Sequence, residues 1–161
     1  MPLIKNKFIL NIILIFSLTS LIIAYFIQYI LGHQPCNLCL IERIPYFAAV
    51  ILISLILFLD KYEKIISLIV GLFFIFGTIV SFYHFGIEQG FFSESLVCDL
   101  ADNNKAASAQ DLLKQLEEKN ISCKDVTFKL FGLSLATFNT IISLFLSVIM
   151  LKIVIYYGKN K

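Results

Sequence analysis

Long apolar stretches alternate with short polar ones along the chain, and this pattern predicts four membrane-spanning helices. A helix needs about 20 predominantly apolar residues to cross a hydrocarbon core about 30 Å thick. Four segments meet this requirement, at about residues 8–31, 40–59, 65–87 and 130–157. The second is the least regular, because Glu42 and Arg43 fall at or just inside its outer end. We therefore expect an all-α integral membrane four-helix bundle that forms a single membrane domain.

The composition agrees with a bilayer environment. Hydrophobic residues make up 59% of the 161 positions and charged residues only 15%, against about 45–50% and about 25% in ordinary soluble domains. The net charge is only +2, and no basic cluster with interleaved aromatic residues occurs outside the apolar segments. This excludes a nucleic-acid partner and leaves the lipid bilayer as the expected surroundings.

Basic residues in the short flanks predict the orientation of the spans. Lysines occur in the N-terminal tail, in the turn at residues 60–64 and at the C-terminal end, so both termini are expected in the cytoplasm. The opposite face then carries outer loops at about residues 32–39 and 88–129. The first apolar segment is too long for the core of a secretory signal, and no A-x-A site precedes Gln34. We expect it to be an uncleaved span.

All four cysteines fall in these two outer loops. Cys36 and Cys39 are expected at the bilayer edge, and Cys98 and Cys123 in the longer, water-exposed loop. Cysteines outside the cytoplasm meet oxidising conditions and form disulfides. Four cysteines could instead complete a tetrahedral zinc site, but an oxidising compartment works against it, so we expect no metal site. A disulfide between Cys98 and Cys123 could also be a purely structural staple, and this alternative stays open.

The longer outer loop contains the signals of one short amphipathic helix. Ser108 is placed as its N-cap, and Leu112, Leu113 and Leu116 follow at helical spacing. Such a helix could lie on the bilayer surface or pack on the ends of the spans, and the sequence does not separate these two possibilities.

The C-x-x-C pair leads directly into the second span, where the positive end of a helix favours a cysteine thiolate. Arg43 is the only arginine in the chain and lies four residues after Cys39, on the same face of a helix. Its planar guanidinium could stabilise a Cys39 thiolate or an anionic oxygen of a bound ligand. The alternative is an interfacial anchor paired with Glu42.

A thiolate at the bilayer edge implies an electron acceptor that is itself soluble in lipid, and quinones meet this requirement. The chain has no nucleotide-binding loop and no C-x-x-C-H haem attachment motif. His84 lies near the outer end of the third span and could hydrogen-bond a quinone carbonyl or carry a proton. It could equally be an interfacial histidine without a role, and His33 is expected to be an ordinary loop residue.

Three motifs in this order resemble the disulfide bond formation protein B (DsbB) family of quinone-dependent thiol oxidases. They are Pro35–Cys39, Glu42–Tyr46 and Tyr83–Gly90, followed by Cys98 and Cys123. The resemblance covers nearly the whole chain, and the P-C-x-L-C-x-x-x-R run with the later cysteine pair is its specific part.

The resemblance implies an enzyme of the bacterial inner membrane with its cysteine loops in the periplasm. A reduced DsbA-like thioredoxin-fold oxidase would attack Cys98 of a Cys98–Cys123 disulfide, and Cys123 would then attack Cys36. Cys39 would be freed as a thiolate beside ubiquinone or menaquinone, with Arg43 and His84 as candidate quinone-binding residues.

Two other functions remain open at this point. One is a non-catalytic membrane protein whose disulfides are structural. The other is a relay of the vitamin K epoxide reductase type. The order of the cysteine pairs disfavours that second reading, because in that family the C-x-x-C that meets the quinone follows the shuttle pair, whereas here it comes first.

Overall fold

The computed structural model describes residues 2–58, 63–93, 98, 123–124, 129–130 and 132–159. Its elements are α1 (Pro2–Tyr29), α2 (Asn37–Ile41), α3 (Ile44–Phe58), α4 (Glu63–Glu88), β1 (Lys129–Leu130), β2 (Leu133–Ser134) and α7 (Leu135–Lys159). Within these residues, four segments are long and apolar enough to cross a membrane: Lys7–Tyr29, Asn37–Phe58, Glu63–Glu88 and Leu135–Tyr156. The predicted all-α four-helix membrane bundle is confirmed. The predicted amphipathic helix at Ser108 lies outside the described residues.

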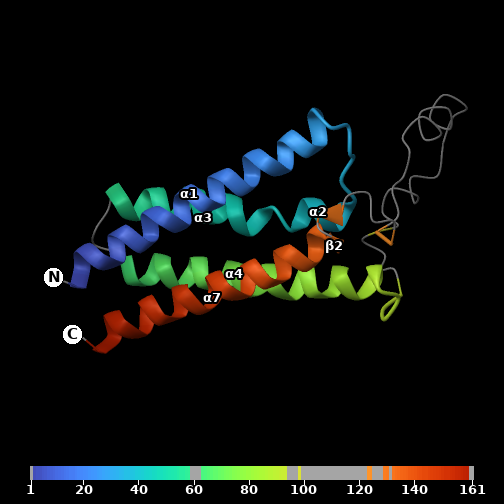
Figure 1. Cartoon of the computed structure of the whole chain (residues 1–161). Coiled ribbons are helices and arrows are strands. Elements are labelled where there is room, and N and C mark those ends of the chain that lie inside the picture. The colour runs from blue at the N-terminus through green and yellow to red at the C-terminus, as the bar shows by residue number, and fades with distance from the viewer. Residues whose placement is uncertain are drawn as a thin grey trace, which may run out of the picture.

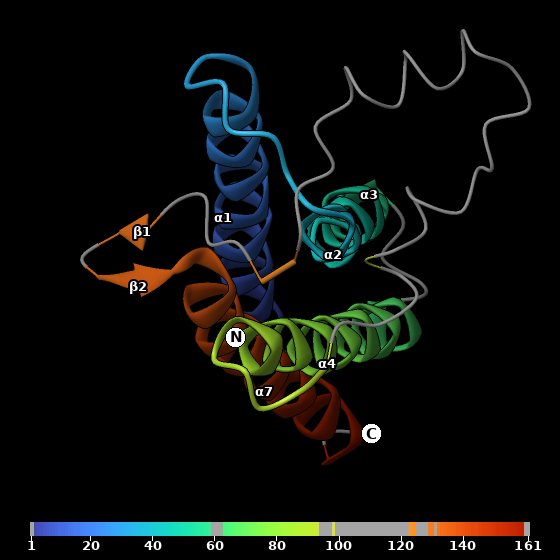
Figure 2. The ribbon, with the colours of Figure 1, turned by 90° about the vertical axis from the view of Figure 1, so that its right-hand side faces the viewer.

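The helices run side by side, with both chain termini at one end of the bundle and α2 and β2 at the other (Figure 1). The principal packing pairs are α1 with α3, α3 with α4, and α4 with α7. Figure 2 looks onto the α2 end and shows the β1–β2 hairpin projecting from the edge of the bundle. Because α1 and α7 are not a principal pair, space remains between them, and both cavities described below are lined by these two helices.

The second span is two helices in succession, since α2 ends at Ile41 and α3 begins at Ile44. Pro45 lies in the first turn of α3, where its missing N–H group costs no helical hydrogen bond. A Cβ atom added to Gly77 of α4 would lie 2.8 Å from Pro45 Cγ, so the two helices approach closely here. The break places Glu42 and Arg43 between two helices instead of within one.

The fourth span begins later than predicted. The chain from about residue 130 was expected to be helical, but it forms an antiparallel β1–β2 hairpin before α7 starts at Leu135. Gly132 turns this hairpin with a φ of 83°, a conformation that glycine adopts without strain. The hydroxyl of Ser134 then accepts the backbone N–H of Thr137 at 3.2 Å and caps the helix start. Apolar composition alone could not reveal this cap.

Candidate active site

The two cysteine pairs meet in one buried cluster at the α2 end of the bundle. Cys36 and Cys123 belong to the cluster itself, and Cys39 and Cys98 pack against it. Cys98 and Cys123 form a disulfide with their Cα atoms 5.9 Å apart. The sequence placed this pair in a water-exposed loop, but Cys123 is only 2% exposed. Its sulfur is buried because it packs on the apolar side chains around Cys36 as a small hydrophobic group.

The first cysteine pair is held by the start of α2. Cys36 is the N-cap residue, and its Sγ accepts the backbone N–H of Cys39 at 3.3 Å. The two sulfurs lie 2.6 Å apart, so small side-chain shifts suffice to join them as a disulfide. The pKa of the Cys36 thiol is lowered to about 5, chiefly by the hydrogen bond from Cys39 and further by His84, against the opposing effect of burial.

In this unbonded pair the geometry favours a thiolate at Cys36. The Cys39 thiolate that the resemblance implies belongs to the later state in which Cys36 is bonded to Cys123, and it stays a prediction. The helix N-terminus acts as predicted, but its N–H group points at the sulfur of the capping residue and not at the one inside the first turn.

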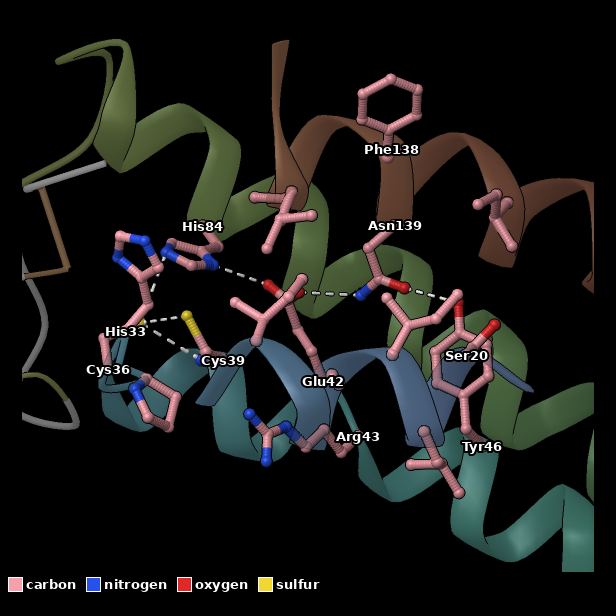
Figure 3. A pocket seen from close by; sticks show the side chains of 18 of the residues that line it. Ser20, His33, Cys36, Cys39, Glu42, Arg43, Tyr46, His84, Phe138 and Asn139 are labelled. Atoms are coloured by element: carbon pink, nitrogen blue, oxygen red, sulfur yellow. Dashed lines mark hydrogen bonds and ion pairs between the residues drawn. The ribbon is translucent and has the colours of Figure 1, made fainter. Parts of the chain in front are cut away.

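A chain of polar side chains leads from Cys36 into the bundle. His84 Nε2 lies 3.6 Å from Cys36 Sγ, and His84 Nδ1 lies 2.7 Å from Glu42 Oε1. Asn139 Nδ2 donates to Glu42 Oε2 at 2.8 Å, and the Tyr46 hydroxyl donates to Asn139 Oδ1 at 2.6 Å. Figure 3 shows this chain as a continuous row of dashed contacts. The ionised Glu42 carboxylate can only accept hydrogen bonds, so the ring hydrogen of a neutral His84 lies on Nδ1. Nε2 is then free to accept a proton from Cys36.

Sequence reasoning named His84 but missed the other members of this chain. Glu42 was considered only as a possible partner of Arg43, although it is 8% exposed and pairs with His84. Its signal was available, because an acidic residue inside a predicted span is a functional-site hypothesis by default. Asn139 offered a weaker signal as a polar residue in the fourth span.

Arg43 points away from this chain, toward α1 (Figure 3). Its Nη1 donates to Gln28 Oε1 at 2.6 Å, and its guanidinium lies 5.0 Å from the centre of the Tyr25 ring. Hydrogen bonding and a cation–π contact thus fix the planar group in one position. The predicted alternative of an anchor paired with Glu42 does not describe this geometry.

Arg43, His84 and both cysteines of the first pair line one cavity of about 270 Å³. The polar and charged part of its wall consists of Ser20, His33, Gln34, Cys36, Cys39, Glu42, Arg43, Tyr46, His84, Glu88 and Asn139. The apolar part consists of Leu21, Ile23, Ala24, Ile27, Pro35, Leu135, Ala136, Phe138 and Ile142. His33, expected to be an ordinary loop residue, is thus part of the cavity wall. A cavity whose wall combines apolar side chains with convergent polar groups is typical of a small-molecule site.

Comparison with known proteins agrees with this arrangement. The chain matches the family "Disulfide bond formation protein DsbB" over residues 6–153. It is also 26% identical over 160 residues to an uncharacterized protein of Rickettsia prowazekii (strain Madrid E), covering 97% of this chain and 92% of that one. No solved structure matches the chain. Since the family match spans the cysteine pairs and nearly all of the four helices, the chain belongs to the DsbB family of membrane disulfide bond formation proteins.

Proposed function

We propose that this protein is a thiol oxidoreductase that takes two electrons from a periplasmic DsbA-like thioredoxin-fold protein and delivers them to a membrane quinone. The observation that carries this proposal is the single cluster that contains both cysteine pairs, with a cavity on the side of the C-x-x-C pair. A purely structural Cys98–Cys123 disulfide would not need to lie in the same cluster as the unbonded Cys36 and Cys39.

The two sulfurs of the disulfide differ in access, and this supports an order of events. Cys123 is buried, whereas Cys98 is partly exposed. A thiolate of the partner protein can therefore attack Cys98, which forms a mixed disulfide between the partner and Cys98, breaks the Cys98–Cys123 bond and releases Cys123 as a thiolate. Resolution of this mixed disulfide by the partner's second cysteine leaves the partner oxidised and the pair reduced.

The reduced pair then passes its two electrons to the C-x-x-C pair by thiol–disulfide exchange. Cys123 lies in the same cluster as Cys36, so its thiolate attacks a Cys36–Cys39 disulfide at Cys36 and leaves Cys39 reduced. Attack by Cys98 on the resulting mixed disulfide restores the Cys98–Cys123 bond. Each step consumes one thiol and forms one. Over the two steps the thiols of Cys98 and Cys123 are replaced by those of Cys36 and Cys39, so the electrons balance.

Reoxidation of the C-x-x-C pair requires an acceptor of two electrons and two protons, and a membrane quinone is such an acceptor. The chain contributes the Cys36 thiolate and a histidine, His84, that holds the proton from Cys36 on Nε2 while Glu42 faces Nδ1. Arg43 lines the same cavity, and the guanidinium N–H groups that do not bind Gln28 can donate to a carbonyl or anionic oxygen.

The cavity suits a flat ring with an apolar tail. An apolar groove of about 790 Å³ between α1 and α7 shares Ile142 with the cavity, so the two spaces adjoin. It is lined by Ile9, Ile12, Ile13, Phe16, Ile141, Ile142, Phe145, Leu146, Ile149, Lys152, Ile153 and Tyr156. A ubiquinone or menaquinone ring would lie near Arg43 and its isoprenoid tail along this groove, within the depth of the bilayer.

The membrane placement follows from the same proposal. The cysteine end of the bundle faces the periplasm of a bacterial inner membrane, and the end with both termini faces the cytoplasm. The lysines flanking the spans support this orientation, and oxidising chemistry at the cysteine end requires it.

The test is quinone reduction by the purified full-length protein in detergent micelles. With a reduced thioredoxin-fold dithiol protein as donor, we expect one quinol formed for each dithiol oxidised. Absorbance of the quinone and thiol titration of the donor measure the two halves separately. If the donor protein were oxidised but no quinol formed, the assignment of quinone as the acceptor would be wrong. If neither the donor nor the quinone reacted, the disulfides would be purely structural.

Replacing Arg43 with lysine is expected to raise the KM for quinone about tenfold or more. Lysine keeps the charge but cannot reproduce the planar hydrogen bond to Gln28 and the contact with Tyr25, and a hydrogen bond to a charged group contributes about 1.5–3 kcal/mol. Steady-state kinetics with varied quinone measures the effect, and thermal unfolding checks that the fold is kept. Lys64→Arg, at the far end of the bundle, is the control. An unchanged KM in Arg43→Lys would exclude Arg43 from quinone binding.

A further inference from the structure

We propose that the reduced Cys36–Cys39 pair, together with His84, forms a binding site for a zinc ion. The ligand atoms of these three residues all lie within 4.8 Å of one another. Two thiolates and an imidazole are the soft and borderline donors that zinc prefers. The sequence allowed a zinc site only on four cysteines, but the Cys98–Cys123 disulfide removes two of those ligands. A histidine that is distant in sequence takes their place.

The distances suit one metal ion. With zinc–sulfur bonds of about 2.3 Å and zinc–nitrogen bonds of about 2.0–2.1 Å, tetrahedral geometry places a sulfur and a nitrogen about 3.6 Å apart and two sulfurs about 3.8 Å apart. Cys36 Sγ and His84 Nε2 are 3.6 Å apart. The two sulfurs are 2.6 Å apart, so the Cys39 side chain would have to turn outward by about 1.2 Å to reach tetrahedral spacing.

The surroundings of His84 match those of a metal ligand. Zinc-binding histidines almost always donate their other ring nitrogen to a carboxylate or carbonyl, which fixes the tautomer and the ring orientation. Glu42 Oε1 accepts from His84 Nδ1 at 2.7 Å, and Asn139 in turn holds the other oxygen of Glu42. The nitrogen that faces Cys36 is therefore the one with a free lone pair.

A second, independent observation supplies a candidate for the fourth ligand. Glu88 lines the same cavity and its side chain is only 6% exposed. Its Oε1 lies 3.8 Å from His84 Nε2, while its Oε2 is buried without a hydrogen-bond partner among the described residues. A buried carboxylate oxygen without a partner costs free energy. Glu88 is not among the three residues whose ligand atoms all lie within 4.8 Å of one another, so its side chain would have to rotate toward the ion to become the fourth ligand and remove this cost.

Zinc binding and disulfide formation exclude each other in this pair. Binding converts two thiols to thiolates and releases two protons, without electron transfer. A Cys36–Cys39 disulfide has no thiolate to offer, so the site exists only in the reduced pair. If the proposed function holds, the pair is reduced once in every turnover, and zinc would then stop turnover by occupying the electron donor.

The experiment uses the full-length chain with Cys98→Ser and Cys123→Ser, in detergent micelles, so that the C-x-x-C pair holds the only thiols. The reduced protein is titrated with Co²⁺, followed by its thiolate charge-transfer absorption, and Zn²⁺ is then added in competition. We expect one ion per chain. Glu42→Gln, which removes the hydrogen-bond partner of His84, should weaken zinc affinity about 10- to 100-fold. His84→Ala removes a ligand itself, so it should weaken zinc affinity by at least as much. Glu63→Gln, a change of a buried carboxylate at the opposite end of the bundle, should leave the affinity unchanged.

Oxidising Cys36 and Cys39 to a disulfide should abolish binding without any change at His84, so a folding defect in His84→Ala does not obscure the result. Equal affinity in His84→Ala and its parent, or zinc retained by the oxidised pair, would overturn the proposal. No quinone is present in these titrations, so their failure is separate from a failure of the proposed thiol oxidase activity.

Discussion

Replacing Cys36 with serine is expected to abolish quinone reduction by the thioredoxin-fold donor. A serine hydroxyl can neither form a disulfide nor carry the thiolate that Cys39 and His84 stabilise at this position. Cys39→Ser should also abolish turnover, because a lone Cys36 cannot give up two electrons as a disulfide. The same assay of quinol formation measures both variants against the unmodified chain.

The second pair provides the contrast that makes this result specific. In the variant with Cys98→Ser and Cys123→Ser, the donor protein should no longer drive quinone reduction. A small dithiol that fits the cavity should still drive it through Cys36 and Cys39. If Cys36→Ser kept measurable turnover with either donor, electrons would have to bypass the C-x-x-C pair. The proposed path would then be wrong.

The spans and the cysteine pairs could be predicted from sequence because each depends on local composition or on counting. An apolar run of about 20 residues has few alternatives to a membrane helix. The break between Ile41 and Ile44 could not be read in this way, since Pro45 is compatible with both a kink and a new helix start. The late start of α7 depends on Ser134 and Gly132, whose capping and turning roles are hidden in an apolar stretch.

The polar chain of the site could not be predicted because its members meet only through tertiary packing. Glu42, His84 and Asn139 come from three different spans, and each alone has an ordinary explanation at a membrane interface. The prediction that Cys123 is exposed to water was wrong for a related reason. Its immediate neighbours in sequence are polar, and only the fold brings it into the same buried cluster as Cys36.

Glu42→Gln is expected to lower kcat for quinone reduction about 10²- to 10⁴-fold, the range of a positioned proton acceptor. Glutamine has the same size and occupies the same place at the start of the second span. Its carboxamide cannot accept from both His84 Nδ1 and Asn139 Nδ2 as the carboxylate does. One of the two donors is left unpaired, and the tautomer that presents a free Nε2 to Cys36 is no longer enforced.

Glu63→Gln is the matched control, because Glu63 is also a buried carboxylate but lies at the start of α4, at the opposite end of the bundle. It should leave kcat unchanged. The rate of Cys36 alkylation by a small reagent gives a readout that a loss of stability alone would not produce. In Glu42→Gln the pH at which half of Cys36 reacts as thiolate should rise from about 5, since a histidine no longer held by a carboxylate stabilises the thiolate less well. An unchanged alkylation profile together with normal kcat would show that His84 needs no carboxylate to serve Cys36.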